Sequence, residues 1–309
     1  MKILITGVHG FVGSNLVKAL SREHTIYGLD IVSPVKDGVR FTFSWGFLDK
    51  PDEIPEVDAI IHLAGKAHDT KNQTVSDVYF KVNTGLTQKI YDYFLKSNAK
   101  KFIFFSTAKA AADKVEGILT EDVVPSPKGP YGESKIAAEK YIQEHLSDEK
   151  QVYIFRPCMI HGPGNKGNLN LLYHVVKKGI PWPLGAFENR RTFTSVGNIC
   201  FAVEGVLTKD VPSGIYNMGD DEALSTNELI EEICKSLGKK AHIWKLPKGL
   251  MNGVAKIGGM LHLPLDSERL RKLTEDYVSS NAKIKKALGV EKMPVDAREG
   301  LKVTLESFK

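Results

Sequence analysis

The sequence predicts an α/β fold, a doubly wound parallel sheet with helices on both faces, followed by a smaller α/β C-terminal domain. The first half of the chain alternates short β-type runs with amphipathic segments, which is typical of a parallel sheet. A glycine-rich loop over residues 7–13 follows the first run and opens a helix. Beyond Arg156 glycine and proline become frequent, which indicates a loop-rich region where substrate specificity usually resides.

The elements follow from local patterns. Helices are predicted near residues 14–22, 75–97 and 131–146, between the β-type runs. Ser225 has the pattern of a helix N-cap, because Glu228 follows three positions later and can complete a capping box. Strands are predicted at residues 2–6, 25–30, 40–44, 59–63, 101–106, 151–156 and 214–218.

Length and charge limit the classes of function. The chain has 309 residues, about twice a typical domain, so one large α/β unit or two domains are expected. The net charge of +5 is modest and the lysines are spread along the chain, so no nucleic-acid partner is implied. A mild positive balance suits an anionic small-molecule ligand.

The cysteines indicate neither a disulfide framework nor a zinc site. Cys158, Cys200 and Cys234 are widely spaced and form no Cys-x-x-Cys unit, so reduced thiols and no metal are expected. The N-terminal apolar run is too short for a signal peptide, and no stretch approaches the ~20 apolar residues of a membrane helix. A cytoplasmic protein without a membrane partner is therefore predicted.

The loop Gly7-Val8-His9-Gly10-Phe11-Val12-Gly13 suggests a dinucleotide site. Such a site needs a tight turn, a backbone without Cβ beside a pyrophosphate, and a helix N-terminus that faces the anion. Strand, loop and helix come in the required order, so the loop predicts a Rossmann-type site; the alternative is a plain strand-to-helix turn. His9 is included in the site, although the sequence offers it no partner and a structural role is the simpler interpretation.

Asp30 ends the second predicted strand, 23 residues after Gly7. A carboxylate at this place can accept hydrogen bonds from the adenosine ribose, and it would repel a 2′-phosphate. The sequence therefore favours NAD over NADP. Lys36 is near enough to weaken that preference, and Asp30 could also simply end a strand.

Tyr131 and Lys135 stand four residues apart at the start of a predicted helix, downstream of Ser106 and Thr107 at a strand end. A tyrosine that acts as a base at neutral pH needs about 4 kcal/mol of stabilisation of its phenolate. A lysine one turn away could supply roughly that amount. The same spacing recurs at Tyr173 and Lys177, where the surrounding pattern predicts ordinary helix surface and core.

With these features in order, the chain resembles the extended short-chain dehydrogenase/reductase family, most nearly its NAD-dependent nucleotide-sugar epimerase/dehydratase branch, of which UDP-glucose 4-epimerase is an example. Residues 58–65, 82–85 and 156–164 resemble that family's segments beside the cofactor and substrate. The resemblance implies cofactor contacts by Leu63, Ala64, Gly65, Asn83, Ser106, Tyr131, Lys135 and Pro157, in addition to the loop and Asp30.

In such proteins the tyrosine takes a proton from a sugar hydroxyl while hydride leaves the same carbon for the nicotinamide. The resemblance thus implies that Tyr131 is the base, that Lys135 lowers its pKa and binds the nicotinamide ribose, and that Thr107 orients the substrate. Ser106 is one position off the usual alignment. Because strand side chains alternate between faces, only one of the two hydroxyls should point at the site.

The expected substrate contacts lie on both sides of this group. Arg191 resembles the arginine that holds a sugar nucleotide's diphosphate, with a solvated basic pair as the alternative. Arg269 is a second candidate, and a helix-surface charge explains it equally well. The remaining predicted contacts are Lys66, Thr107, Tyr131 and Met159. Lys109 stands where dehydratases of this family carry part of an Asp-Glu pair, which argues against loss of water.

The resemblance implies an NAD-dependent 4-epimerase of a UDP-hexose or UDP-N-acetylhexosamine. The alternatives are an NAD(P)H-dependent 4-reductase of a UDP-4-keto-6-deoxy-N-acetylhexosamine, from the surface-polysaccharide branch, and a non-catalytic NAD-binding sensor. By analogy a homodimer forms through the helices near 75–97 and 131–146. The expected domains are a cofactor domain, 1–160 with a returning segment near 192–218, and a substrate-binding domain, 161–191 and 219–309.

Overall fold

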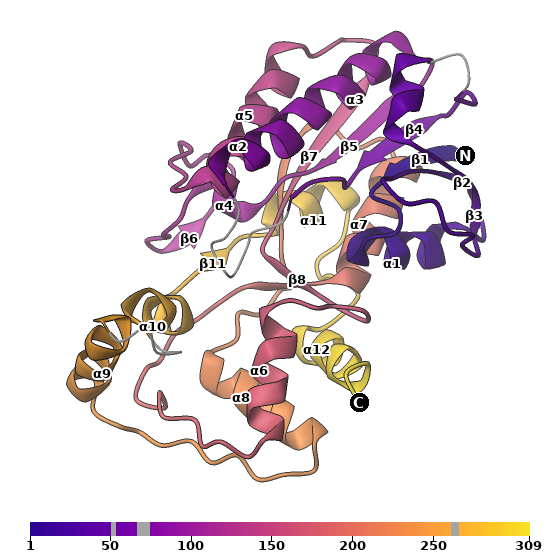
Figure 1. The fold of residues 1–309 in the computed structure, drawn as a ribbon. Coiled ribbons are helices and arrows are strands. Elements are labelled where there is room, and N and C mark those ends of the chain that lie inside the picture. The colour runs from indigo at the N-terminus through magenta and orange to yellow at the C-terminus, as the bar shows by residue number, and fades with distance from the viewer. Residues whose placement is uncertain (51–53, 67–74, 261–265) are drawn as a thin grey trace.

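The computed structural model describes all residues except 51–53, 67–74 and 261–265. Its main sheet has seven parallel strands in the order β10-β7-β5-β4-β1-β2-β3 (Figure 1). The strands are β1 (Lys2–Thr6), β2 (Thr25–Leu29), β3 (Val39–Phe43), β4 (Ala59–His62), β5 (Lys101–Phe105), β7 (Gln151–Pro157) and β10 (Gly214–Met218). This confirms the predicted doubly wound fold, and each strand begins and ends within one residue of its predicted bounds.

Helices cover both faces of the sheet (Figure 1). On one face α1 (Phe11–Leu20), α7 (Val196–Thr208) and α11 (Ala282–Leu288) close a core around Ile5 and Phe155. On the other face α3 (Leu86–Lys96) and α5 (Pro130–Glu144) bury a second core that includes aromatic side chains of β5. α11, which lies within the predicted substrate-binding domain, packs its apolar stripe of Ile284 and Leu288 against the sheet half.

The helix predicted over 75–97 is three consecutive segments. α2 (Ser76–Tyr79) leads into a π-helical turn, η3 (Phe80–Gly85), and then into α3. The wider turn brings Asn83 fully inside the protein, against the start of α5. α5 itself begins as the sequence predicts, with proline at its first position after Gly129, whose φ is +85°.

The second half of the chain forms a separate core below the sheet. It consists of α6 (Asn168–Lys177), α8 (Thr226–Ser236), α9 (Lys248–Met260), α10 (Ser267–Thr274) and α12 (Ala297–Glu306). Ser225 caps α8 in the predicted capping box with Glu228. In α6, Tyr173 is buried and Lys177 lies over its ring, so this second Tyr/Lys pair is helix core and surface as predicted.

Short elements join the two halves. The pair β8 (Met159–His161) and β9 (Phe193–Ser195) lies below the sheet, and β6 (Ile118–Leu119) pairs with β11 (Val278–Ser279). Two further short helices are η1 (Trp45–Asp49) and α4 (Ala108–Ala111). Among the described residues, no helix is long and apolar enough to cross a membrane. The strand order reverses direction between β1 and β4, and in such sheets ligands bind at that point, beyond the carboxyl ends of the strands.

Candidate active site

The glycine loop lies at this switch point and is shaped by close backbone contacts. Gly7 has a φ of +70°, and a Cβ there would lie 3.0 Å from the Ala64 nitrogen. A Cβ on Gly13 would lie 2.4 Å from the Gly7 oxygen, so neither position accepts a side chain without a shift of the backbone. Gly10 caps α1 without a side-chain hydrogen bond, which leaves the first N–H groups of the helix available to an anion. The loop therefore fits the pyrophosphate of a dinucleotide.

Asp30 follows β2 beside this loop. Its Oδ2 accepts a hydrogen bond from the backbone N–H of His9 at 3.0 Å, and its Oδ1 accepts one from Ile31 at 2.7 Å. His9, for which the sequence offered no partner, has its Nε2 3.1 Å from the Thr42 hydroxyl. Burial lowers the pKa of His9 further than nearby Asp30 raises it, so the ring is neutral at pH 7. Asp30 is thus fixed beside the loop, and His9 joins the loop to Thr42.

Lys36 closes the outer side of the loop. Its Nζ donates to the Val8 carbonyl at 3.2 Å and to the Ser14 hydroxyl at 2.6 Å. The ammonium group therefore lies against the start of α1, close enough to Asp30 for that carboxylate to raise the Lys36 pKa, although burial lowers it more. A positive group, Lys36, and a negative group, Asp30, thus both lie against the glycine loop.

The end of β4 forms the wall next to the loop. Leu63 and Ala64 follow the strand, and the Ala64 N–H donates to the Thr6 hydroxyl at 3.1 Å. A Cβ on Gly65 would lie 2.9 Å from Asn83 Oδ1 and 3.2 Å from Lys135 Nζ, so a glycine is needed there. The Asn83 amide bonds both backbone groups of Lys66, at 2.8 Å and 3.2 Å, and the Ser134 hydroxyl at 3.0 Å. Asn83 thus joins the segment after β4 to α5. Its side chain, which is predicted to contact the cofactor, makes these hydrogen bonds within the protein.

Tyr131 and Thr107 come together at the ends of β5 and α5. The Thr107 hydroxyl is hydrogen-bonded to the Tyr131 hydroxyl and also caps α4 by accepting from the Lys109 N–H at 3.3 Å. Burial raises the Tyr131 pKa, the Thr107 hydrogen bond lowers it, and Tyr79 raises it, with a net increase. Tyr131 therefore carries its proton at neutral pH, and the lowering of its pKa by Lys135 stays a prediction.

Lys135 is buried one helical turn away and points toward the sheet. Its Nζ donates to the Phe105 carbonyl at 2.8 Å and lies 4.8 Å from the centre of the Phe104 ring. Burial lowers the pKa of Lys135 to about 8, although Glu139 acts in the opposite direction. The amine is thus mostly protonated at neutral pH and loses its charge at slightly alkaline pH.

Ser106 and Thr107 point in opposite directions, as strand alternation requires. The Ser106 hydroxyl donates to Glu139, and Arg156 pairs with the same carboxylate through Nε at 3.1 Å. All three side chains are buried. The hydroxyl of Ser106, a residue predicted to contact the cofactor, is therefore used in a hydrogen bond inside the protein. Sequence reasoning missed Glu139 and Arg156; the four-residue spacing from Lys135 to Glu139 was the available signal for the first.

Lys66, Thr107 and Tyr131 belong to the sheet half, and the other predicted substrate residues lie toward the facing half of the molecule. Arg191, after the loop from α6, is partly buried and donates through Nη1 to the Lys272 carbonyl of α10. Arg269 lies on the outer side of α10, half exposed, with its Nε 3.6 Å from Asp266. Met159 lies half-buried in β8, next to Pro157 at the end of β7. Arg191 is therefore oriented by the backbone of α10, whereas Arg269 lies on the surface of that helix.

Charged side chains connect α4 to α10 beside Thr107. Lys109 contacts Asp113 at 3.2 Å and lies over the Tyr277 ring at 4.7 Å. Arg271 of α10 reaches the other oxygen of Asp113 at 3.3 Å. Burial raises the Asp113 pKa, but the two cations outweigh it and the net shift is downward. These residues place a lysine, and no carboxylate acid–base pair, next to the threonine.

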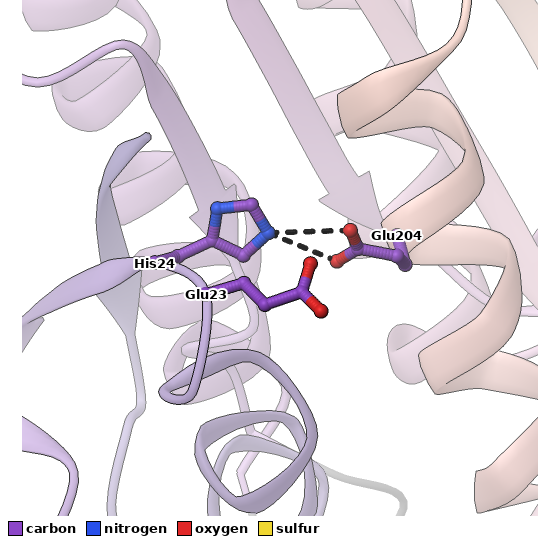
Figure 2. A group of neighbouring side chains, drawn as sticks. All are labelled: Glu23, His24 and Glu204. Carbon is purple, nitrogen blue, oxygen red and sulfur yellow. Dashed lines mark hydrogen bonds and ion pairs between the residues drawn. The ribbon is translucent and has the colours of Figure 1, made fainter.

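Among the described residues, one group of three side chains has the spacing of metal ligands. It consists of Glu23, His24 and Glu204, whose ligand atoms lie within 4.8 Å of one another (Figure 2). His24 Nε2 is 3.1 Å from a Glu204 oxygen, so the group joins the turn before β2 to α7. It lies at the opposite end of β2 from Asp30 and has no part in the site.

Comparisons with known proteins identify the family and the fold. Residues 3–219 match the model of the NAD dependent epimerase/dehydratase family. A UDP-glucose 4-epimerase of Vibrio cholerae is 32% identical, over 99% of this chain and 95% of the relative. The N-acetyl-alpha-D-glucosaminyl-diphospho-ditrans,octacis-undecaprenol 4-epimerase of Escherichia coli O157:H7 is 28% identical, over 92% and 84%. The structure of the Thermus thermophilus UDP-glucose 4-epimerase with NAD has a TM-score of 0.77 at 24% identity, over 100% of this chain and 99% of that one.

The matched region includes every part of the site built from the sheet. It contains the glycine loop, Asp30, and the Thr107, Tyr131 and Lys135 group. NAD fits these residues: the N-terminus of α1 would hold its pyrophosphate, Asp30 its adenosine ribose, and Lys135 its nicotinamide ribose, and when bound it supplies a hydride acceptor. The chain belongs to the NAD dependent epimerase/dehydratase family and is an NAD-dependent enzyme of the nucleotide-sugar type.

Proposed function

We propose that the protein is a 4-epimerase of a UDP-hexose or UDP-N-acetylhexosamine that works through a 4-keto intermediate. The observation that carries the proposal is the hydrogen bond between Thr107 and Tyr131, one helical turn from a buried lysine. This arrangement serves proton transfer at a carbinol oxygen. The absence of a carboxylate pair at Lys109 is a reason to prefer it over dehydration.

The proposed reaction has two opposite halves. Because burial raises the Tyr131 pKa, the tyrosine has to lose its own proton before it acts as the base. As the phenolate, Tyr131 takes the proton of the sugar C4 hydroxyl while Thr107 holds the oxygen, and a bound NAD would supply the acceptor for the C4 hydride. After the 4-keto sugar has rotated to present its other face to the cofactor, Tyr131 gives the proton back to the oxygen. No net oxidation occurs, so the cofactor leaves the cycle unchanged.

Arg191 is the proposed diphosphate ligand. Its guanidinium is already oriented by the Lys272 carbonyl, and its remaining N–H groups can bind phosphate oxygens. A diphosphate is common to UDP-sugars and to the polyprenyl-linked sugar in the name of the E. coli relative. The same arginine would serve either carrier, and we propose UDP because the V. cholerae relative is the more similar of the two.

A 4-reductase of a UDP-4-keto-6-deoxy-N-acetylhexosamine is the second candidate. The observation in its favour is Lys36, whose ammonium lies beside the loop where the 2′-phosphate of NADPH would need a cation. Asp30 at the same place opposes that phosphate, which is why we place the reductase second. Either reaction would take place in the cytoplasm, where free thiols such as those of the three unpaired cysteines persist.

One experiment separates the candidates. Purified protein is incubated with UDP-glucose and UDP-N-acetylglucosamine without added cofactor, and then with a UDP-4-keto-6-deoxy sugar plus NADH or NADPH. Interconversion of C4 epimers without added reductant supports the epimerase. Stoichiometric consumption of reduced cofactor, with no interconversion, would replace it with the reductase. A Tyr131→Phe variant is the control, and a variant with unaltered turnover would exclude both.

A further inference from the structure

Helix α9 presents apolar side chains to solvent along one stripe. Leu250, Val254 and Ile257 are 55%, 44% and 53% exposed, and their spacing places them on one face of the helix. The adjoining face carries Met251 and Ala255, which are buried in the lower core. α9 is therefore apolar over two neighbouring faces, and packing within the protein covers only one of them.

The same region carries a strong excess of positive charge. Between Glu232 and Asp266 the sequence contains six lysines and no acidic residue. Lys245, Lys248 and Lys256 are exposed, and the last two lie on α9 itself. The rest of the chain mixes both signs of charge, with 42 basic and 37 acidic residues overall. Positive charge next to an exposed apolar stripe indicates an anionic partner with an apolar interior.

An exposed tryptophan stands on the segment that leads into α9. Trp244 is 54% exposed, yet its backbone is fixed: its N–H donates to the Trp182 carbonyl at 2.8 Å, and its carbonyl accepts from Gly185 at 3.0 Å. An indole held in this way at the surface is typical of the boundary between water and a lipid bilayer, where its apolar body and its N–H are both accommodated.

We propose that the surface formed by Trp244, Leu250, Val254 and Ile257, with the neighbouring lysines, docks the enzyme onto an anionic membrane surface. A second copy of the chain is the less suitable partner, because a symmetric contact would bring the two lysine groups together. The apolar side chains enter the headgroup region and the lysines bind lipid phosphates.

The proposed surface belongs to the half of the protein that faces the substrate. α9 packs on α10, and α10 contacts the active site at two points, the Lys272 carbonyl with Arg191 and Arg271 with Asp113. Figure 1 shows α9 and α10 at the outer edge of this half, away from the sheet. Docking through α9 therefore keeps the sheet half, with its cofactor loop, away from the lipid. The inference stands whichever sugar or carrier the enzyme uses.

The test is co-sedimentation with vesicles of phosphatidylcholine alone and of phosphatidylcholine mixed with phosphatidylglycerol. The wild-type chain is expected to pellet with the mixed vesicles and to dissociate at high salt. Leu250→Ser/Ile257→Ser should lower vesicle affinity at least about tenfold, because each apolar side chain withdrawn from water contributes about that factor or more. Turnover of a soluble UDP-sugar by this variant should match the wild type, which shows that it folds.

A matched control removes the same kind of side chain elsewhere. Leu171 and Val175 are 57% and 41% exposed on α6, and Leu171→Ser/Val175→Ser should leave vesicle binding unchanged. Lys245→Gln/Lys256→Gln should reduce binding to the mixed vesicles. The proposal is overturned if the wild type does not pellet with the mixed vesicles, or if the α6 variant loses binding as much as the α9 variant. It also fails if neither the wild type nor the α9 variant binds vesicles and the variant is monomeric where the wild type is a dimer. The α9 surface would then be a contact between two copies of the chain.

Discussion

At the scale of single residues, the two adjacent hydroxyls at the end of β5 have different tasks. Thr107 bonds the Tyr131 hydroxyl, whereas Ser106 donates to the buried Glu139. Thr107→Ala should therefore lower kcat by about tenfold to a hundredfold, the effect of one hydrogen bond to a charged or reacting oxygen. Steady-state kinetics with the preferred UDP-sugar measures this.

Ser106→Ala is the matched comparison. It removes a donor from a buried carboxylate, so it should lower the free energy of unfolding by about 1–3 kcal/mol while kcat changes little. Urea denaturation gives the first quantity. The reverse pattern, a catalytic loss at Ser106 and none at Thr107, would show that the two hydroxyls have been assigned to the wrong roles.

Lys135 gives a prediction for the pH dependence of stability. Its pKa is lowered from 10.5 in the exposed chain to about 8 in the folded protein. Below pH 8 both states hold the proton, and the folded protein bears the full cost of burying the charge. Between these pKa values only the unfolded chain holds the proton, so stability rises with pH in this window.

Lys135→Met should remove this rise together with catalytic activity. The difference in unfolding free energy between wild type and variant should shift in favour of the wild type as pH increases from 8 to 10.5, by up to about 3 kcal/mol. Urea titrations of both proteins at the two ends of the window measure it. A difference that does not change with pH would mean that the lysine is not buried as the structure shows.

At the scale of elements, two glycines of the loop are expected to have different roles, Gly13 in the stability of the fold and Gly10 in cofactor binding. A Cβ on Gly13 meets the Gly7 oxygen at 2.4 Å, whereas a Cβ on the exposed Gly10 meets the same oxygen at 3.1 Å. Gly13→Ala should lower the stability of the NAD-free protein by about 1–3 kcal/mol. Gly10→Ala should leave its melting temperature nearly unchanged and weaken NAD binding, because the methyl group projects into the anion site. Thermal melts and NAD titration by calorimetry distinguish the two.

The elements of the sheet half could be predicted because their signals are local. Each parallel strand is a short apolar run, so the bounds of the strands could be predicted from the sequence. The dinucleotide loop needs glycine at fixed positions, so its place in the chain could be predicted as well. The π-helical turn at Phe80–Gly85 could not be predicted, because its buried Asn83 bonds Ser134, 51 residues away, and no local pattern signals such a contact. The direction of Arg191 likewise depends on a carbonyl 81 residues away in the chain.

At the scale of the whole molecule, we predict a homodimer formed by α2, α3 and α5. Val75, Val78, Phe80 and Leu146 are 67%, 41%, 38% and 58% exposed on or next to these helices. Light scattering after gel filtration should give twice the chain mass of 34.2 kDa, and Phe80→Asp should give the monomer. A Leu250→Ser/Ile257→Ser protein should remain a dimer; a monomeric wild type at working concentration would contradict the prediction.

The buried pair of Glu139 and Arg156 also has an evolutionary consequence. Loss of either partner leaves an uncompensated charge inside the protein, at a cost of about 3–5 kcal/mol, which is a large part of the stability of an ordinary domain. A lineage can therefore leave this state only if both positions change almost together. Across homologues the two columns should covary, and a sequence with one partner alone should carry a compensating change at Ser106 or Lys135, which both interact with the Glu139 carboxylate.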